Sequence, residues 1–447
     1  MFKNFLYRSA VAATVALSLA ACSDDDKPKE TEDPKGEMEQ LTPTESKKFL
    51  ETTANEFLGK FRAADQRDLI VLASYFDEEY ADLEAPEEFD IDEEESVNPA
   101  ATYIRELARA VKSADASRAG AAAIKYTYTL DPAKFKGVYE PGVSRWIRKA
   151  DSKDIIFRFT DAAGKQCELK AEMSDKTSDG EVSVFDEYYD YETGTYVENG
   201  EEYVYKFRIP KDVTVTLTCG GSELASAKVN SDLSVSGHKV SVTANVKAAN
   251  LDAAVKLDGT DNQVAMNSSL VVSGETVVTA RATVNGNHLC DFDFYRDMEG
   301  DEDDLIALFK DGSAAVSVLD KVRVDANVTF NRSVFKAIDD EFDNYEFNTQ
   351  ASAETAVKNA VATLNSSIKA EVRYNNKETV QATLFWKYDF EEWGEYWEYT
   401  IEPLMQFEAD KTTYSFEEYF ENGFASVEDQ WDALLESYEK VWDSAQK

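Results

Sequence analysis

Histidine, the residue that most often performs acid–base catalysis, is scarce in this sequence of 447 residues. Histidine occurs only as His238 and His288, and each lies at or just after a predicted turn, where exposure to solvent is expected. A Ser-His-Asp system needs a histidine held by both partners, and no serine stands in a G-x-S-x-G motif. The glycine-rich phosphate-binding motifs and the H-E-x-x-H metal motif are also absent from the sequence. We therefore predict no enzymatic activity, no cofactor and no metal ion.

The first 21 residues have the pattern of an export signal. Lys3 and Arg8 give the first eight residues a positive charge without any acid, and residues 9–21 are uncharged. A positive start, a short apolar stretch and small residues before a cleavage site are typical of such signals. The apolar stretch is shorter than the roughly 20 residues that a permanent membrane-spanning helix needs. A buried core helix is the alternative.

Cys22 follows this apolar stretch and is the residue with the clearest predicted chemistry. The sequence LAAC, which ends at Cys22, resembles the lipobox of bacterial lipoproteins, and the acidic residues that follow, Ser23 to Asp26, resemble the export signal of Bacteroidota-type surface lipoproteins. The resemblance implies a signal peptide at 1–21, lipidation of Cys22, and a place on the outer membrane at the cell surface. Orientation toward the periplasm stays open.

Charge limits the classes of partner. The chain has 47 basic and 87 acidic residues, which gives a net charge of −40. A field of this sign repels nucleic acid, so we expect no nucleic-acid partner. The membrane is expected as a partner through the lipid anchor, and a glycan or another envelope protein is the further candidate. Among so many acids some carboxylate pairs lie close by chance, and a glycosidase pair stays a minor alternative.

Aromatic residues alternate in the segment 384–402, which reads as a hairpin that turns near Trp393-Gly394. Aromatic rows beside carboxylates can stack on sugar rings, whereas aromatic residues are also ordinary strand formers whose cross-strand pairs stabilise sheets. A protein interface is a third interpretation, because Tyr and Trp are enriched there. The candidate ligand contacts are Trp386, Tyr388, Trp397 and Tyr399. A glycan site would need Trp386, Trp397 and Tyr399 to be exposed and coplanar.

Two further predictions concern covalent chemistry. If Cys22 carries lipid, Cys167, Cys219 and Cys290 remain, so at most one disulfide forms within the chain and its pairing is open. Buried thiols are the alternative. Asp443-Ser444-Ala445 resembles the acceptor sequence for O-glycosylation of exported Bacteroidota-type proteins, which makes Ser444 a candidate acceptor.

Hydrophobic periodicity predicts helices near both ends and strands between them. Thr42-Pro43-Thr44-Glu45 is a capping box with proline at the first helical position. Five residue pairs suit tight hairpin turns: Gly220-Gly221, Ser236-Gly237, Asp258-Gly259, Ser273-Gly274 and Asn285-Gly286. The expected helices span about 43–62, 65–83, from Asn98 to about 111, 301–309, 352–364 and 426–442.

These elements predict an α+β fold, in which a long twisted antiparallel β-meander has helices from both termini packing on one face. We expect a signal peptide at 1–21, a disordered acidic tether at 22–40, a helical region at 41–120, the meander at 121–300 and an α+β region at 301–447. Separate domains are the alternative arrangement. The predicted function is a non-catalytic, lipid-anchored surface lipoprotein with a binding or structural role. A glycan-binding module and a carrier of an apolar ligand in a curved sheet are the alternatives.

Overall fold

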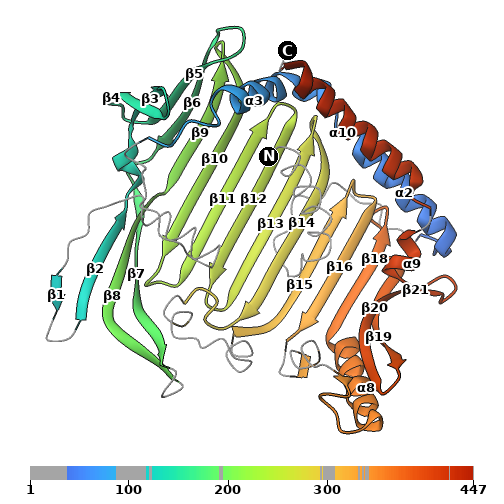
Figure 1. Ribbon diagram of the computed structural model, residues 1–447. Helices are drawn as coiled ribbons and strands as arrows, with labels where there is room; N and C mark the ends of the chain where they lie inside the picture. The colour runs from blue at the N-terminus through green and yellow to red at the C-terminus, as the bar shows by residue number, and fades with distance from the viewer. Residues whose placement is uncertain are drawn as a thin grey trace. The chain divides into compact units, whose positions relative to one another are not determined.

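The computed structural model describes residues 38–86, 117–119, 123–190, 195–291, 294, 308–330, 333–334, 337, 342–421 and 423–445. These residues form a mostly β structure with helices mainly toward the two ends of the chain (Figure 1). The predicted α+β class and the antiparallel sheet are therefore confirmed. Two strand pairs are parallel, namely β2 (Ala123–Leu130) with β8 (Thr195–Pro210) and β3 (Gly137–Pro141) with β5 (Ile155–Thr160). Cys22, most of the tether and the helices predicted from Asn98 and Asp301 lie outside the described residues.

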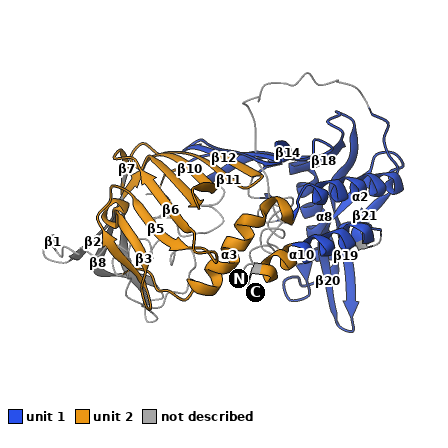
Figure 2. Cartoon of the chain, turned by 90° about the horizontal axis from the view of Figure 1, so that it is seen from above, with its two compact units in different colours: residues 1–62, 257–289, 298–437 blue, residues 63–256, 290–297, 438–447 orange. Residues whose placement is uncertain are grey.

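The chain divides into two compact units, each discontinuous in sequence (Figure 2). Unit 1 comprises residues 1–62, 257–289 and 298–437, and unit 2 comprises residues 63–256, 290–297 and 438–447. The domain bounds given by sequence stay predictions. Each unit is described below by itself.

Unit 1 contains an antiparallel sheet in which strands that are neighbours in sequence are mostly neighbours in space. The order departs from the sequence at one place, where β18 (Ile368–Tyr374) pairs directly with β16 (Val322–Thr329). Short strand β17 instead pairs with β20. The strands are β13 (Gln263–Val272), β14 (Glu275–Gly286), β15 (Phe309–Val318), β16 (Val322–Thr329), β17 (Phe342–Asp343), β18 (Ile368–Tyr374), β19 (Val380–Trp393), β20 (Tyr396–Phe407) and β21 (Thr413–Ser415).

Helix α2 (Pro43–Gly59) begins where the sequence predicts. The Thr42 side chain accepts from the backbone N–H of Glu45, and the Glu45 carboxylate accepts from the N–H of Thr42 at 2.9 Å. Two donors that the first helical turn leaves unpaired are thereby satisfied, which confirms the capping box. Other helices that the structure describes in unit 1 include α8 (Gln350–Ser367), α9 (Phe416–Glu421) and residues 425–437 of α10 (Ala425–Ala445).

Helices α2, α8 and α9 pack on the same face of β19. Ala382 lies in a buried cluster with Phe407 and Tyr419, against which Leu50 of α2 packs. Trp386 packs against a second cluster that includes Leu364 of α8. Because side chains alternate along a strand, Ala382 and Trp386 point to one side of the sheet. In this unit, helices from both ends of the chain thus contact one face of the hairpin.

Unit 2 contains a four-stranded sheet in the order β1–β2–β8–β7 and a second run of strands covered in part by helix α3 (Arg67–Glu79). Leu72 of α3 is buried with Trp146, Phe159 and Cys167. The strands are β1 (Ser117–Ala119), β2 (Ala123–Leu130), β3 (Gly137–Pro141), β4 (Trp146–Ala150), β5 (Ile155–Thr160), β6 (Gln166–Met173), β7 (Thr177–Asp190), β8 (Thr195–Pro210), β9 (Asp212–Cys219), β10 (Ser222–Ser234), β11 (Lys239–Ala248) and residues 251–256 of β12 (Leu251–Thr260).

A disulfide joins Cys167 of β6 to Cys219 of β9. The two cysteines are directly opposite each other in the antiparallel pairing of these strands, with their Cα atoms 4.0 Å apart. Cys290 is buried and is not part of a disulfide. The pairing that the sequence left open is therefore Cys167–Cys219.

Two of the five predicted turns are confirmed, and two are wrong. Gly220-Gly221 and Ser273-Gly274 connect successive strands, and all four residues have positive φ, as such turns require. Ser236-Gly237 lies in the loop before β11, but the positive φ belongs to His238. Asp258-Gly259 lies inside β12, and Asn285-Gly286 lies at the end of β14.

Gly286 has a different role from that of a turn residue. A Cβ atom at this position would lie 2.0 Å from the backbone oxygen of Leu308. The glycine therefore permits close approach of two backbone segments within unit 1, which is the other common reason for glycine in a strand.

Tyr374 makes a buried polar contact in unit 1, and the contribution of this residue to the stability of the fold depends on pH. Its ring is 1% exposed, its centroid lies 4.5 Å from that of Phe49, and its hydroxyl is hydrogen-bonded to the hydroxyl of Ser46. Burial raises the pKa of Tyr374 above its ordinary value of 10.0. The folded protein therefore keeps this proton at a pH where the unfolded chain loses it, and the associated stability is lost as pH rises past about 10.

We predict that Tyr374→Phe lowers the free energy of unfolding at pH 7.5 by about 1 kcal/mol, because the Ser46 hydroxyl loses its buried partner. The difference in free energy of unfolding between wild type and variant should narrow toward pH 10.5. Only the wild type has a buried phenol that stays protonated at a pH where the unfolded chain loses the proton, so only the wild type loses stability. Urea unfolding at several pH values measures this difference. Tyr345→Phe, at an 81% exposed position, is the control. A difference that is independent of pH would contradict the expectation.

Candidate binding surface

The hairpin of β19 and β20 presents two faces with different chemistry. The strands pair without interruption from Ala382–Phe407 to Trp393–Tyr396. Gly394, with φ 68°, lies in the connecting turn, so the turn predicted near Trp393-Gly394 is confirmed. Because side chains alternate along each strand, even-numbered residues of β19 share a face with odd-numbered residues of β20.

The first face, which we call the inner face, carries the four aromatic residues predicted from sequence, and it is covered by α8 (Figure 1). Tyr399 is 6% exposed and belongs to the buried cluster that includes Val357 of α8. Trp386, Tyr388 and Trp397 are half-buried and pack against the same cluster.

The inner face does not have the geometry that a sugar platform needs. The ring planes of Tyr388 and Trp397 lie at 65° and 66° to that of Tyr399. The Nε1 atom of Trp386 is buried and has no hydrogen-bond partner among the residues that the structure describes. The expectation that these rings are exposed and coplanar is therefore wrong, because the apolar stripe of α8 packs on them.

The second face, the outer face, carries three other aromatic residues at the end of the hairpin. Trp393 is 55% exposed and stacks on Tyr396, its cross-strand partner, with ring centroids 5.4 Å apart and planes at 22°. Tyr345 is 81% exposed, and its centroid lies 5.7 Å from that of Tyr396. We call Tyr345, Trp393 and Tyr396 the tip cluster.

The backbone turn that presents Tyr345 is held by Asp343. The Asp343 carboxylate accepts from the backbone N–H groups of Tyr345 at 2.8 Å and Glu346 at 3.0 Å. Asn344 donates its backbone N–H to the carbonyl of Trp397 at 3.3 Å. The most exposed ring of the tip cluster thus stands on an ordered turn fixed to the hairpin.

Three carboxylates form a row next to the tip cluster. Glu398 of β20 lies directly opposite Asp343 of β17 on one side and Glu391 of β19 on the other. Like charges directly opposite each other destabilise a sheet. The segment 387–402 has six acidic residues and a single lysine. The outer face therefore combines exposed aromatic rings with an excess of negative charge, within which the buried Asp343 carboxylate accepts backbone hydrogen bonds.

Tyr396 links the rings to the carboxylates. Its hydroxyl lies 3.4 Å from carboxylate oxygens of both Asp343 and Glu398, at the long end of hydrogen-bond range. Partial burial, and then the negative charges of Glu398 and Asp343, raise the pKa of Tyr396 to about 12. The phenol is therefore a neutral donor at physiological pH, and its aromatic ring adds no charge to the outer face.

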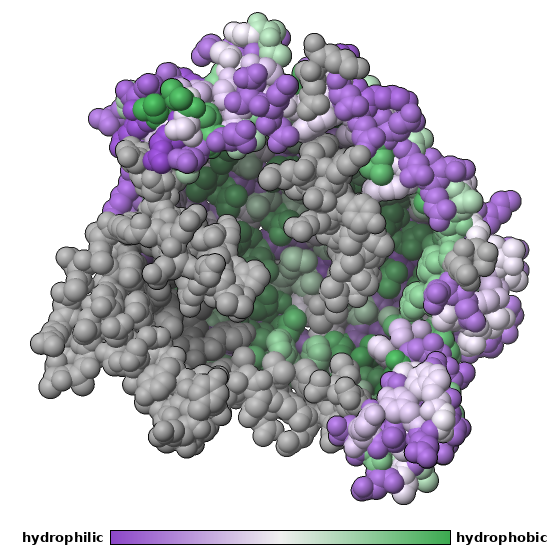
Figure 3. Space-filling view, in the orientation of Figure 1, coloured by the Kyte–Doolittle hydropathy of each residue, from purple (hydrophilic) through white to green (hydrophobic). Residues whose placement is uncertain are grey.

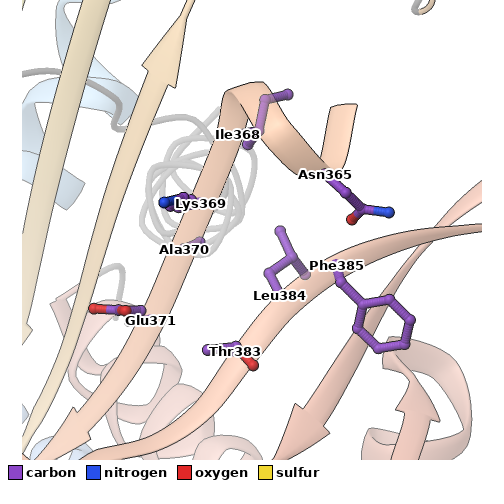
Figure 4. A pocket seen from close by; sticks show the side chains of 8 residues that line it. All are labelled: Asn365, Ile368, Lys369, Ala370, Glu371, Thr383, Leu384 and Phe385. Carbon is purple, nitrogen blue, oxygen red and sulfur yellow. The ribbon is translucent and has the colours of Figure 1, made fainter. Parts of the chain in front are cut away.

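A cavity of about 260 Å³ lies where the end of α8 meets β18 and β19 (Figure 4). Asn365 is already used structurally, because its side chain bonds the backbone N and O of Trp386 at 2.7 and 2.8 Å. The remaining polar side chains of the lining are Lys369, Glu371 and Thr383. This set offers one cation, one carboxylate and a hydroxyl, without the paired carboxylates of a glycosidase site. The cavity is suited to a small polar molecule at most.

The other sequence-predicted sites are scattered. His238 and His288 both have positive φ in turns, in agreement with their prediction as turn residues. Ser444 is exposed on the last turn of α10, with its hydroxyl bonded to the carbonyl of Val441, and its glycosylation stays a prediction. Lipidation of Cys22 also stays a prediction, because Cys22 lies outside the described residues. None of the helices in the described part of the chain has the length and apolar character required to cross a bilayer.

Comparison with known proteins adds no assignment. No protein-family model matches the chain, and no curated protein matches it. Among solved structures, a porin-like protein from Bacteroides vulgatus ATCC 8482 is similar to 51% of this chain and 88% of its own chain, with 8% sequence identity and a TM-score of 0.17. Similarity at this level carries no argument about fold or function.

Sequence reasoning missed the tip cluster. The sequence pattern predicts Trp393 as a turn residue and indicates no role for Tyr396, and Tyr345 is distant in sequence from both. A signal for two of the three residues was present, because the turn at Gly394 fixes Trp393 opposite Tyr396 on the face away from Trp386. Tyr345 had no such signal, since its position depends on the β17–β20 pairing.

We predict that Trp393 is the tryptophan most accessible to reagents, because the other five are half-buried or buried. Limited oxidation with N-bromosuccinimide, followed by peptide mass mapping, should modify Trp393 first. Trp393→Phe should abolish the fast phase, and Trp386→Phe should leave it unchanged. Fast modification of Trp386 or Trp397 would contradict the assignment of inner and outer faces.

Proposed function

We propose that the protein is a non-catalytic, lipid-anchored lipoprotein of the outer membrane, displayed at the cell surface, that binds a partner through the tip cluster. The observation that carries the binding role is the group of exposed rings beside the carboxylate row. Large aromatic side chains offer a wide contact area at a small cost in conformational entropy, and they are enriched at interfaces.

The residues at the start of the described chain are fixed to unit 1, as a membrane tether attached there requires. Met38 donates its backbone N–H to the Thr379 hydroxyl at 3.0 Å, and Leu41 donates to the side-chain oxygen of Gln381 at 2.8 Å. The chain from Cys22 to Met38 cannot exceed about 55 Å even when fully extended. A lipid on Cys22 would therefore keep Met38, where the described part of unit 1 begins, within that distance of the membrane surface.

We predict that Cys22→Ser moves the protein from the membrane to the soluble fraction, because stable anchoring depends on acyl chains. Fractionation of cells, followed by immunoblotting, measures the change. Cys290→Ser, at a buried cysteine, is the matched control and should leave the protein in the membrane fraction. Protease treatment of intact cells should degrade the wild type if it faces outward. Membrane association of Cys22→Ser equal to that of wild type would contradict the anchor.

A carrier of an apolar ligand is the second candidate function, and a specific surface of unit 2 favours it. Strands β6, β9, β10 and β11 align Ala171, Val215, Ala227 and Val246 in one row across the sheet. Val246 is 44% exposed, and Leu169, two residues along β6 from Ala171, is 38% exposed. Figure 3 shows apolar side chains gathered on the side of these strands that faces the viewer.

This second candidate predicts binding of 11-(dansylamino)undecanoic acid with an increase in dansyl fluorescence. Val246→Asn should weaken binding at least 10-fold, because a polar amide would lie in the apolar row. Val143→Asn, at a fully exposed position of the same unit, is the control and should have no effect. No fluorescence increase, or an equal loss in both variants, would exclude this function.

A further inference from the structure

We infer that the partner of the tip cluster is a basic protein segment, whose arginine side chains stack on Trp393 and Tyr345 and pair with Glu391 and Glu398. The inference rests on the proposed binding function and specifies the chemistry of the partner. It concerns unit 1 alone, and each residue that it uses lies within the described part of the chain.

The rings provide the stacking surface. Trp393 is held parallel to Tyr396 by their cross-strand pairing, so it covers one side of Tyr396 and keeps its own ring exposed. Tyr345 stands beside Tyr396 at 47° between the ring planes, which gives the cluster two exposed rings at different angles. Arginine stacks on aromatic faces through its planar guanidinium, with tryptophan as the best partner.

The charge of the hairpin selects the partner. Glu398 faces Glu391 and Asp343 across the strands, and each of these pairings opposes two negative charges. A guanidinium placed between two such carboxylates replaces repulsion by attraction and forms charge-assisted hydrogen bonds. The half-buried Glu398 and the exposed Glu391 both have oxygen atoms that a partner can reach.

The alternatives fit the outer face less well. A neutral glycan would stack on the rings but would not reduce the repulsion among the carboxylates of Asp343, Glu398 and Glu391. A divalent cation needs several oxygen ligands at about 2.3–2.6 Å. Among the described residues, Asp161, Cys167 and Cys219 bring three atoms of ligand type within 4.8 Å of one another, but the two sulfur atoms are joined in the disulfide, and no such group occurs at the tip cluster. A planar guanidinium can instead donate hydrogen bonds to a carboxylate and stack on an aromatic ring.

The direct test uses full-length Cys22→Ser protein and a fluorescein-labelled peptide of alternating arginine and glycine, with fluorescence anisotropy as the readout. Binding should be saturable and should weaken between 50 and 300 mM NaCl, because part of the attraction is screened by salt. Trp393→Ala should raise Kd at least 10-fold, and Trp393→Phe should recover part of the loss. Glu391→Gln/Glu398→Gln should likewise raise Kd at least 10-fold.

The control separates this site from the general negative field of a chain with a net charge of −40. Glu417→Gln/Asp429→Asn removes the same charge from exposed positions on α9 and α10 and should change Kd less than twofold. Equal losses in the two double variants, or no effect of Trp393→Ala, would overturn the inference. Tip-dependent binding of dextran or laminarin in place of the peptide would also overturn it. Because fractionation of Cys22→Ser is independent of this assay, failure of the anchor and failure of the partner assignment are distinguishable.

Discussion

The packing of α8 on one face of the β19–β20 hairpin is the constraint that the candidate surface depends on. Ala353, Val357, Ala360 and Leu364 of α8 are at most 8% exposed and lie against the aromatic residues of the inner face. Burying a large apolar side chain stabilises a fold by about 1.5–3 kcal/mol. A slip of one residue in the register would exchange the faces and place Asp389 and Glu391 against α8. The apolar stripe therefore fixes Trp393 and Tyr396 on the side that remains exposed.

The same constraint explains why carboxylates gather on the outer face. An ionised carboxylate is costly to bury without a partner, so the acids of the hairpin must occupy the positions that α8 does not cover. Cross-strand pairing then sets Glu391 beside Glu398 whether or not their charges are compatible. The repulsion that results is small in water, because solvent screens it. It becomes significant only when a partner excludes that water, which makes the row sensitive to the charge of the partner.

Sequence reasoning succeeds here where structure is local and fails where it depends on register. The capping box at Thr42 and the apolar stripe of α8 are encoded within a few residues, and both were predicted. Glycine-containing pairs predicted turns less well. Gly286 permits two backbone segments to approach closely, whereas Leu319-Asp320 forms a turn with positive φ and contains no glycine. The disulfide needed the β6–β9 register, which no short motif specifies.

At the candidate site, too, the local pattern predicts the hairpin, whereas the exposure of its side chains depends on packing with residues distant in sequence. Alternating aromatic residues identified the hairpin, but residue type alone could not separate the rings that build the core from those that face solvent. Trp386 and Trp393 are residues of the same type, and they lie seven positions apart along β19. Because seven is odd, they point to opposite sides of β19, so only one of them can lie under α8. Once a helix is known to cover one face of such a hairpin, the parity of each position decides whether an aromatic residue stabilises the fold or is available to a partner.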